Sequence, residues 1–379
     1  MTNIPFVKRK VGETYLVWFQ NSNLYFQLEE PAWFVFSRLA DNGVEEIIVY
    51  EFSERYEVAL DDSRTFVEEI RLKAEEMNQS SEPYHDREET IAVLNDFEFE
   101  SHSTFKYELG DQIIQFVYGT PWLEKYIHPL IEHLETLHDV TDSFLFELFY
   151  WNECVVFRFN KQIKGIWRRD ESHFVKGKIF LELINVLHKK TDADWLMTVH
   201  ASAITNGRKT ILFSAEPGSG KTTMAALLQA KGYHLISDDF VPFDKYSIDA
   251  YPFPIAMSVK EGSMELLTSF YPELEGKAVN RITSEKSVRY LPIENEMMKM
   301  VFPVQEIIFI KYDDTIDFKL EKLDPVVALK LLLDQIWVPP AAENVETLFD
   351  RIFQFSFYQL TYSHNEKALK AIGKLFGDE

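Results

Sequence analysis

The sequence predicts a mixed α/β protein of two domains, a small α+β domain followed by a larger α/β domain. Residues 14–28 have the pattern of a β-hairpin, and three amphipathic helical patterns follow it. A polar segment, residues 78–90, then separates this region from the rest of the chain. Residues 211–240 alternate strand, glycine loop, helix and strand, which is typical of an α/β sheet. We therefore expect one domain over residues 1–90 and a second over residues 91–379.

Charge and composition exclude several classes of partner. The chain of 379 residues has a formal net charge of -22, so no surplus of Lys and Arg is available to bind nucleic acid. Part of the excess is local, because Glu45 to Glu100 contain 18 acidic and 5 basic residues. The single cysteine, Cys154, excludes an internal disulfide and suits a reducing compartment. Without a signal-peptide pattern or a long uncharged run, we expect a soluble, cytoplasmic protein that binds no membrane.

Four local patterns define the first domain. In residues 14–28, aromatic and β-branched runs flank the turn-forming sequence NSN. Residues 29–43 have a helical apolar face and a glycine at the end, and residues 44–58 and 63–77 read as two further amphipathic helices. The side chains expected to be buried are Trp33, Phe36 and Leu39 in the first helix, Ile47, Ile48 and Phe52 in the second, and Phe66 and Ile70 in the third.

Residues 10–78 also carry a longer pattern: a hairpin that ends in YFQLEEPAWFVFSRL, then a VEEII helix, then FVEEI before the boundary. This pattern resembles the PqqD-like leader-peptide recognition domain, a small winged-helix-like α+β fold. The resemblance implies that the domain binds the leader of a precursor peptide as an added β-strand beside a sheet edge. Backbone hydrogen bonds would supply affinity there, and side-chain pockets would supply selectivity. The alternative is a small packing domain without a ligand.

The second domain is predicted to have two parts. Residues 97–197 read as a mixed lead-in, in which FKYELGDQIIQFVYG and CVVFRFNKQIKGIW alternate like antiparallel strands. Between them, LEKYIHPLIEHLETLH reads as a helix. Residues 198–379 would then form the core that carries the chemistry.

Residues 215–222 match the Walker phosphate-binding loop, with alanine in place of its first glycine. Ala215 is acceptable there if its φ is negative. Backbone N–H groups at the start of the following helix would face the phosphates of a nucleotide. Lys221 would reach the β- and γ-oxygens, and the Thr222 hydroxyl would hold Mg²⁺. The residues that we assign to the nucleotide are Glu216, Pro217, Gly218, Ser219, Gly220, Lys221, Thr222 and Thr223.

Two adjacent carboxylates follow the next strand. Leu235 and Ile236 mark a buried strand that delivers Asp238 and Asp239 at its C-terminal end, where open α/β sheets bind ligands. Holding Mg²⁺ requires one carboxylate. A second one allows a division of labour, in which one group binds the metal and the other takes a proton from the attacking hydroxyl. The alternative is that one of the pair is only a turn residue.

The spacing around this loop carries a second resemblance. His200 opens a strand 21 residues before Lys221, and Asp239 lies 18 residues after Lys221. With the loop and the GYHLISDD strand, these features resemble the kinase core of HPr kinase/phosphorylase and its relatives. PFPIAMSVKEGS, VRYLPIE and VQEIIFIKYDD fit the same group, so the likeness covers roughly residues 100–376. It implies a P-loop kinase core of the HPr kinase/PEP carboxykinase-like type, with ATP and Mg²⁺ as cofactors, and is compatible with a homo-oligomer.

Carried over residue by residue, this resemblance assigns roles to four side chains. His200 would lie beside the reacting phosphate, and Lys221 would contact the γ-phosphate. Asp239 would be the general base. Asp238 would orient the site or bind the metal.

A second set of positions departs from the family. Where HPr kinases have LEIRG, this chain has MSVKEG, which places Ser258 at the metal-binding glutamate and Lys260 at the arginine. Lys260 still offers charge to a phosphate, although without the bidentate geometry of arginine. Ser258 cannot replace a carboxylate, so a second metal and the reverse phosphorylase reaction are not implied. Arg289 is either a phosphate contact or part of an ion pair.

These patterns together predict an ATP/Mg²⁺-dependent kinase that phosphorylates a side-chain hydroxyl, in particular serine, on a precursor peptide held by its leader. Tethering by the leader would raise the effective concentration of the acceptor at the kinase site. One alternative is a kinase of HPr, of another small protein or of a small hydroxyl compound such as free serine. A non-enzymatic alternative is a nucleotide-gated peptide-binding module. The pair Asp238 and Asp239 argues against this last alternative, because holding a nucleotide does not require a base.

Overall fold

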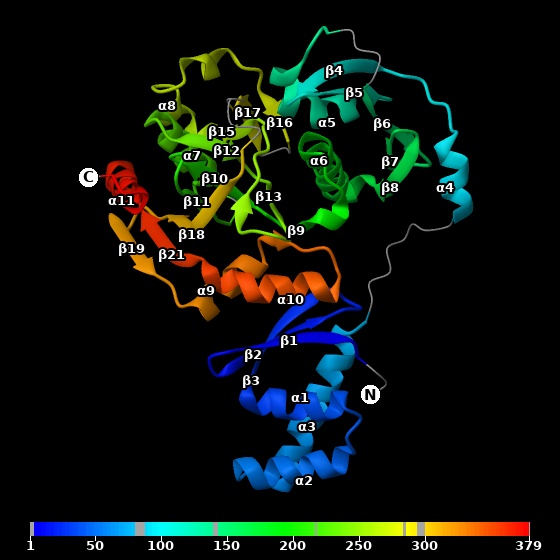
Figure 1. Ribbon diagram of the computed structural model, residues 1–379, viewed down its shortest axis with the longest axis vertical. Helices are drawn as coiled ribbons and strands as arrows, with labels where there is room; N and C mark the ends of the chain where they lie inside the picture. The colour runs from blue at the N-terminus through cyan, green and yellow to red at the C-terminus, as the bar shows by residue number, and fades with distance from the viewer. Residues whose placement is uncertain are drawn as a thin grey trace. The chain divides into compact units, whose positions relative to one another are not determined.

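The protein is described by a computed structural model, and it forms two units, the smaller of which combines segments from both halves of the sequence (Figure 1). The smaller unit comprises Met1–Pro83, Asp324–Leu333 and Val338–Gln354. The larger unit takes the rest of the chain. The residues that the structure describes are 4–79, 88–138, 143–216, 218–282, 286–293 and 300–378. Most of the predicted linker, residues 78–90, lies outside them.

The sheet of the smaller unit contains the predicted hairpin and one further strand. β2 (Thr14–Phe19) and β3 (Leu24–Glu29) pair antiparallel in the register Thr14↔Glu29 to Phe19↔Leu24, which confirms the hairpin. β1 (Phe6–Val11) pairs with the other side of β2, so the strand order is β1-β2-β3. The sequence patterns missed β1, because its run Lys8-Arg9-Lys10 breaks the alternation of apolar and polar residues.

The three predicted helices of this unit are confirmed as α1 (Glu30–Ala40), α2 (Glu45–Tyr56) and α3 (Leu60–Met77). The prediction that Ile47 is buried is wrong, since its side chain is 56% exposed. The buried residues of α2 are instead Ile48, Val49 and Phe52. Because successive residues of a helix are rotated by about 100°, Ile47 lies outside this buried face. The core between the helices is formed by Phe34, Val35, Leu39, Ile48, Val49, Phe52 and Val67, with Phe66 and Ile70 partly buried against it.

Two helices from the far end of the sequence complete this unit, α9 (Pro325–Leu333) and α10 (Ala342–Arg351). α10 packs against β1, where Asp350 forms an ion pair with Arg9. The ring of Phe349 lies 6.3 Å from that of Tyr25 in an edge-to-face contact. No local pattern predicts this association, because it depends on residues more than 300 positions apart in the sequence.

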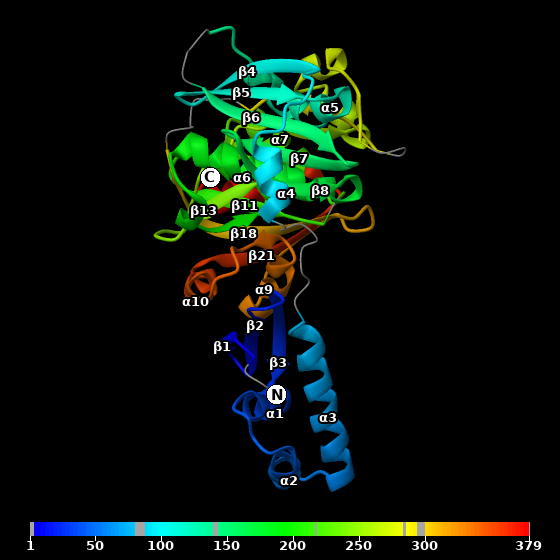
Figure 2. The same cartoon turned by 90° about the vertical axis from the view of Figure 1, so that its right-hand side faces the viewer.

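In the larger unit, the lead-in segment forms a sheet covered by two helices. Its strands are β4 (Ser103–Leu109), β5 (Gln112–Tyr118), β6 (Phe144–Trp151), β7 (Cys154–Phe159) and β8 (Gln162–Arg168), in that order (Figure 2). β5 and β6 run parallel, and the other neighbours run antiparallel. α5 (Pro121–Ile131) ends earlier than the predicted helix, where a 3-10 turn, Glu132–Leu134, follows it. The short helix α4 (Glu88–Asn95) precedes the sheet.

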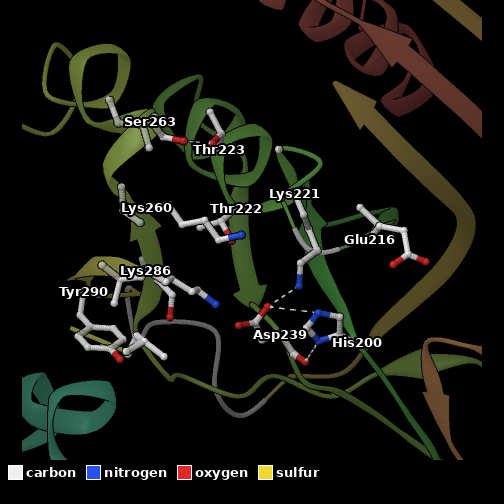
Figure 3. Close-up of a pocket in the computed structure, with 18 of the residues that line it drawn as sticks. His200, Glu216, Lys221, Thr222, Thr223, Asp239, Lys260, Ser263, Lys286 and Tyr290 are labelled. Carbon is white, nitrogen blue, oxygen red and sulfur yellow. Dashed lines mark hydrogen bonds and ion pairs between the residues drawn. The ribbon is translucent and has the colours of Figure 1, made fainter. Parts of the chain in front are cut away.

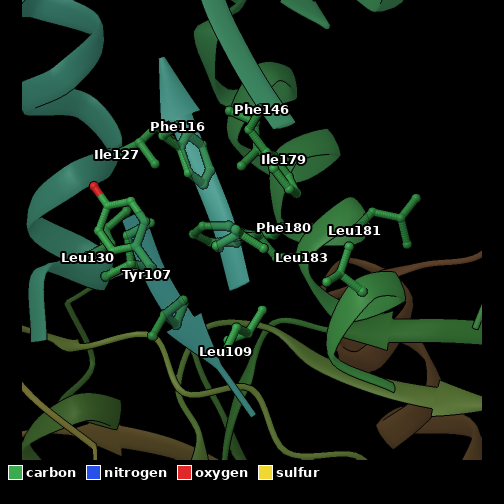
Figure 4. Close-up of a cluster of buried hydrophobic side chains, with 14 of the residues drawn as sticks. Tyr107, Leu109, Phe116, Ile127, Leu130, Phe146, Ile179, Phe180, Leu181 and Leu183 are labelled. Carbon is green, nitrogen blue, oxygen red and sulfur yellow. The ribbon is translucent and has the colours of Figure 1, made fainter. Parts of the chain in front are cut away.

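The core of this lead-in lies between the sheet, α5 and α6 (Ser172–His188) (Figure 4). Phe116 and Phe146 project from the sheet toward Ile179 and Phe180 of α6. α6 contributes many of the buried side chains in this cluster, and it is therefore held rigidly against the rest of the unit.

A larger mixed sheet carries the phosphate loop. Within the described residues its main path is β12-β10-β11-β18-β14-β13-β9-β20, and β21 and β19 extend from β18. β18 runs parallel to both β11 and β21, whereas β10 is antiparallel to β11 and β12. The strands are β9 (Trp195–Val199), β10 (Ala201–Thr205), β11 (Thr210–Ser214), β12 (His234–Ser237), β13 (Val241–Asp244), β14 (Asp249–Ala250), β18 (Phe302–Tyr312), β19 (Phe318–Lys322), β20 (Ile336–Trp337) and β21 (Ser356–Tyr362).

α7 (Lys221–Ala230) and α11 (Asn365–Phe376) pack together beside this sheet. A separate small sheet, in the order β15-β17-β16, lies next to α7 and consists of β15 (Met257–Lys260), β16 (Asn280–Arg281) and β17 (Ser287–Leu291). The short helix α8 (Met264–Leu267) follows β15. In the part of the chain that the structure describes, we find no helix with the length and apolar content needed to cross a bilayer.

Candidate active site

The phosphate loop has the predicted strand and helix on either side. β11, which is buried along its whole length, leads into the loop, and α7 begins at Lys221. Ala215 is not among the residues of positive φ, and the left-handed positions of the loop are Gly218 (φ +97°) and Gly220 (φ +93°). These are the positions where glycine is needed, because other residues strongly disfavour that conformation. The absence of the first glycine therefore does not prevent the turn, although Pro217 lies outside the described residues.

Asp238 is buried directly after β12 and faces the start of α7. Its Oδ2 accepts a hydrogen bond from the Thr222 hydroxyl at 3.2 Å, and its Oδ1 accepts one from the Ser202 hydroxyl of β10. The two predicted Mg²⁺ ligands, Thr222 and Asp238, thus lie side by side. The sequence analysis missed Ser202, whose hydroxyl hydrogen bond helps to orient the Asp238 carboxylate.

Asp239, the next residue, has a strained backbone conformation. Its φ is +69°, in the left-handed region that a residue other than glycine adopts at a cost of about 1–3 kcal/mol. The turn aims its carboxylate at the loop, where Oδ1 forms an ion pair with the Lys221 ammonium (Figure 3). The same ammonium lies 4.0 Å from Oδ1 of Asp238.

His200 reaches the same place from the end of β9. Its Nδ1 lies 3.1 Å from the backbone carbonyl oxygen of Asp239, and because a carbonyl only accepts, Nδ1 carries the proton. Nε2 then faces the Asp239 carboxylate, 3.9 Å from Oδ1 (Figure 3). The backbone N–H of His200 donates to the carbonyl of Gln335 at 2.7 Å, which holds the ring in position.

The electrostatics separate the two carboxylates. Burial and the neighbouring charge of Asp239 raise the pKa of Asp238 above its ordinary value. For Asp239 burial also opposes ionisation, but the Lys221 ammonium, the His200 imidazole and the Lys176 ammonium outweigh it and lower its pKa. Burial disfavours the charged form of Lys221, yet the two carboxylates raise its pKa and keep it protonated. Asp239 is therefore ionised at neutral pH, and Asp238 is the one that resists ionisation.

These groups line a cavity of about 290 Å³. Of the predicted site residues, it is lined by His200, Glu216, Gly218, Gly220, Lys221, Thr222, Thr223, Asp239 and Lys260. Ser219, Asp238 and Arg289 do not line it. Further lining residues that the sequence reasoning missed are Lys176, Ser263, Lys286 and Tyr290. Its four lysines make this cavity suitable for a polyanion such as a triphosphate.

The sheet of β15 and β17 explains which of its side chains reach the cavity. Ser258 lies opposite Tyr290 in the register of the two strands, and both line the cavity. Lys260, two residues along β15, shares their face, since side chains alternate between faces along a strand. Arg289 points to the other face and pairs with Glu261 at 3.0 Å. Of the two roles left open for Arg289, the structure therefore contains the ion pair.

The donor set fits a magnesium ion held partly by substrate. Thr222 and Asp238 supply one hydroxyl and one carboxylate, and Mg²⁺ usually takes one or two protein oxygens together with phosphate oxygens and waters. In the described part of the chain, no cluster of three or more His, Cys, Asp or Glu side chains could hold a metal by itself. The site therefore fits Mg²⁺ that enters with a nucleotide.

The chain also has a distant likeness among solved structures. No family model matches the chain, and no curated protein matches it. Among solved structures, it is similar to the HPr(Ser) kinase/phosphatase from Coxiella burnetii, with 11% identity and a TM-score of 0.20. The similarity covers 48% of this chain and 87% of the other. Because so low a TM-score does not establish a shared fold, the function is inferred from the geometry of the site.

Proposed function

We propose that the protein is an ATP- and Mg²⁺-dependent kinase that phosphorylates a serine hydroxyl of a ribosomally made precursor peptide. One observation carries the proposal of phosphoryl transfer. The phosphate loop brings Lys221 against Asp239, a second carboxylate beyond the one that a metal site needs, and this carboxylate opens into the cavity. A module that only held a nucleotide would gain nothing from a strained, ionised aspartate at that position.

Each side chain has a role in the proposed transfer. The hydroxyl oxygen of the acceptor attacks the γ-phosphorus while Asp239 accepts the hydroxyl proton. The bond between the γ-phosphorus and the bridging oxygen breaks, and its electron pair leaves with ADP. Lys221 and the N–H groups at the start of α7 stabilise the charge on the phosphoryl oxygens. Thr222 and Asp238 would hold Mg²⁺. When bound, this ion would neutralise part of the negative charge of the β- and γ-phosphates.

Substrate choice can depend on a feature remote from the cavity, and the smaller unit offers a binding edge. Among the strands that the structure describes, β3 pairs with β2 alone, so its outer side is an edge. Sheet edges are commonly protected by lysine or proline. β1, at the opposite edge, has the basic run Lys8-Arg9-Lys10, whereas β3 (LYFQLE) contains neither residue type. This difference supports β3 as the edge to which a leader peptide adds as a further strand.

A direct test uses the full chain, ATP, Mg²⁺ and candidate precursor peptides chosen from its gene neighbourhood. Mass spectrometry should detect one added phosphoryl group on the full-length precursor, located on a serine by fragmentation. Separate reactions with a leaderless peptide, with an HPr-type protein and with free serine compare the alternative acceptors. Faster phosphorylation of either of the last two than of the precursor would reject the peptide assignment.

A further inference from the structure

Lys176 lines the cavity from an element that lies outside the phosphate-loop core. It belongs to α6, 45 residues before Lys221, in the segment that precedes the core. Its ammonium lies 5.1 Å from the centre of the Phe180 ring, one turn along the same helix. With the residues that the structure describes it makes no hydrogen bond or ion pair, although it is half-buried. The ammonium is therefore available to an anion that enters the cavity.

Packing connects Lys176 to the reacting end of the cavity. Phe180 contacts Phe240, the residue that directly follows Asp239, with ring centres 5.7 Å apart. Phe253 packs on Phe180 from another side at 5.2 Å. The helix that carries Lys176 is thereby held against the turn that carries Asp239. Burial disfavours the charged form of Lys176 and lowers its pKa, while the charge of Asp239 acts in the opposite direction.

We propose that Lys176 is a catalytic residue whose ammonium, carried by α6 and not by the phosphate-loop core, contacts the transferred phosphoryl group. The transition state of phosphoryl transfer spreads negative charge over three equatorial oxygens. Lys221 approaches these oxygens from α7, and Lys176 supplies a second cation from α6. This is the role that an arginine finger has in other phosphoryl-transfer enzymes, here provided in cis by the lead-in segment. The inference rests on the proposed phosphoryl transfer and not on the identity of the acceptor.

The contacts of Lys176 distinguish it from the two cavity lysines outside the phosphate loop, Lys260 and Lys286. Lys260 and Lys286 belong to the small sheet and its approach, and Lys286 is exposed. Lys176 instead projects from a long helix, next to Val175 and near Ile179, both of which are fully buried. A rigid support of this kind suits a group that must stabilise charge as it develops, since little reorganisation is then needed during the reaction.

The test compares Lys176→Met with Lys178→Met. Methionine keeps an apolar side chain over Phe180 and removes only the charge, and Lys178 lies on the same helix but pairs with Asp192 at 2.7 Å. Lys176→Met should lower the single-turnover transfer rate about 100- to 1000-fold, while the Kd for Mg·ADP stays within about twofold. We expect the wild-type protein to bind ADP more tightly with fluoroaluminate, a mimic of the transferred group, and Lys176→Met should abolish this additional affinity. Lys178→Met should match the wild type in each measurement.

Two outcomes overturn the inference. One is a Lys176→Met protein that transfers phosphate within about threefold of the wild type. The other is an unchanged kcat with a raised KM for the acceptor, which would assign the ammonium to binding of the acceptor. If the wild type phosphorylates no acceptor, the fluoroaluminate measurement still decides, because it needs only nucleotide. A loss of that affinity in Lys176→Met would then support the role of Lys176 while the proposed peptide acceptor fails.

Discussion

The Lys221 ammonium and the Asp239 carboxylate form an ion pair across the mouth of the phosphate loop. In the proposed function, the γ-phosphate of a bound nucleotide would compete with Asp239 for this ammonium, because both are anions at the same side chain. When phosphate takes the ammonium, Asp239 loses the interaction that contributes most to lowering its pKa and becomes a better proton acceptor. In the proposed reaction, arrival of the donor would therefore activate the base.

The first prediction concerns Lys221. Lys221→Ala should reduce phosphoryl transfer by at least about 1000-fold, because the ammonium stabilises charge on the γ-phosphoryl oxygens. The matched control is Lys231→Ala, at the exposed C-terminal end of the same helix, which should retain full activity. Circular dichroism would establish that both variants are folded. Near-normal turnover by folded Lys221→Ala would remove the phosphate-loop assignment.

The second prediction separates the two aspartates. Asp239→Asn should keep nucleotide affinity and lose about two to four orders of magnitude in rate, the usual scale for a general base. Asparagine tolerates the left-handed φ of this position, so the turn should persist. Asp238→Asn should instead raise the Mg²⁺ concentration needed for half-maximal rate. The substitution removes the carboxylate that, beside the Thr222 hydroxyl, would coordinate the ion. If the two phenotypes are exchanged, the pair is correct and the roles are reversed.

The third prediction concerns stability and has opposite signs for the two aspartates. A lowered pKa means that Asp239 stabilises the fold above its unfolded pKa, and this contribution is lost as the pH falls through the folded value. The raised pKa of Asp238 has the opposite effect. Ionisation of this buried carboxyl lowers the stability of the folded state as the pH rises toward neutral. At neutral pH, Asp238→Asn should therefore raise Tm and Asp239→Asn should lower it, each by about a few degrees.

Thermal melts at neutral and at mildly acidic pH would measure both effects. The gain of Asp238→Asn should shrink in acid, because wild-type Asp238 is then protonated and no longer carries the cost. A Tm of Asp238→Asn below that of the wild type at every pH would contradict the assignment of the raised pKa to Asp238.

Features whose cause is local could be predicted from the sequence. The loop, Lys221 and the two aspartates follow from short segments, because a strand, a glycine turn and a helix start fix their positions within a few residues. The hairpin of β2 and β3 was predictable for the same reason. Ile47 was misplaced because the apolar pattern of α2 allows more than one buried face, and packing against α1 and α3 selects one of them.

Features that depend on tertiary packing could not be predicted in this way. Lys176 lies at the cavity because its helix packs on distant segments, as in the contact of Phe180 with Phe240, residues that are 60 positions apart. Arg289 was left with two roles because the face of a strand toward which a side chain points depends on register, which the pairing with β15 sets. The association of α10 with β1 likewise arises from contacts between distant segments.

The last prediction concerns the leader and its charge. Between Glu45 and Glu100 the surplus of 13 negative charges predicts a leader with basic residues, and exposed charge pairs of this kind are screened by salt. For the full chain, KM for the full-length precursor should rise about tenfold from low to high salt, while kcat changes little, because the leader contributes binding remote from the chemistry. KM for a leaderless peptide should be high at both salt concentrations, since that peptide lacks the tether. Equal KM values for the two peptides at low salt would exclude leader binding, and the smaller unit would then be a packing domain of a kinase that selects its acceptor at the cavity itself.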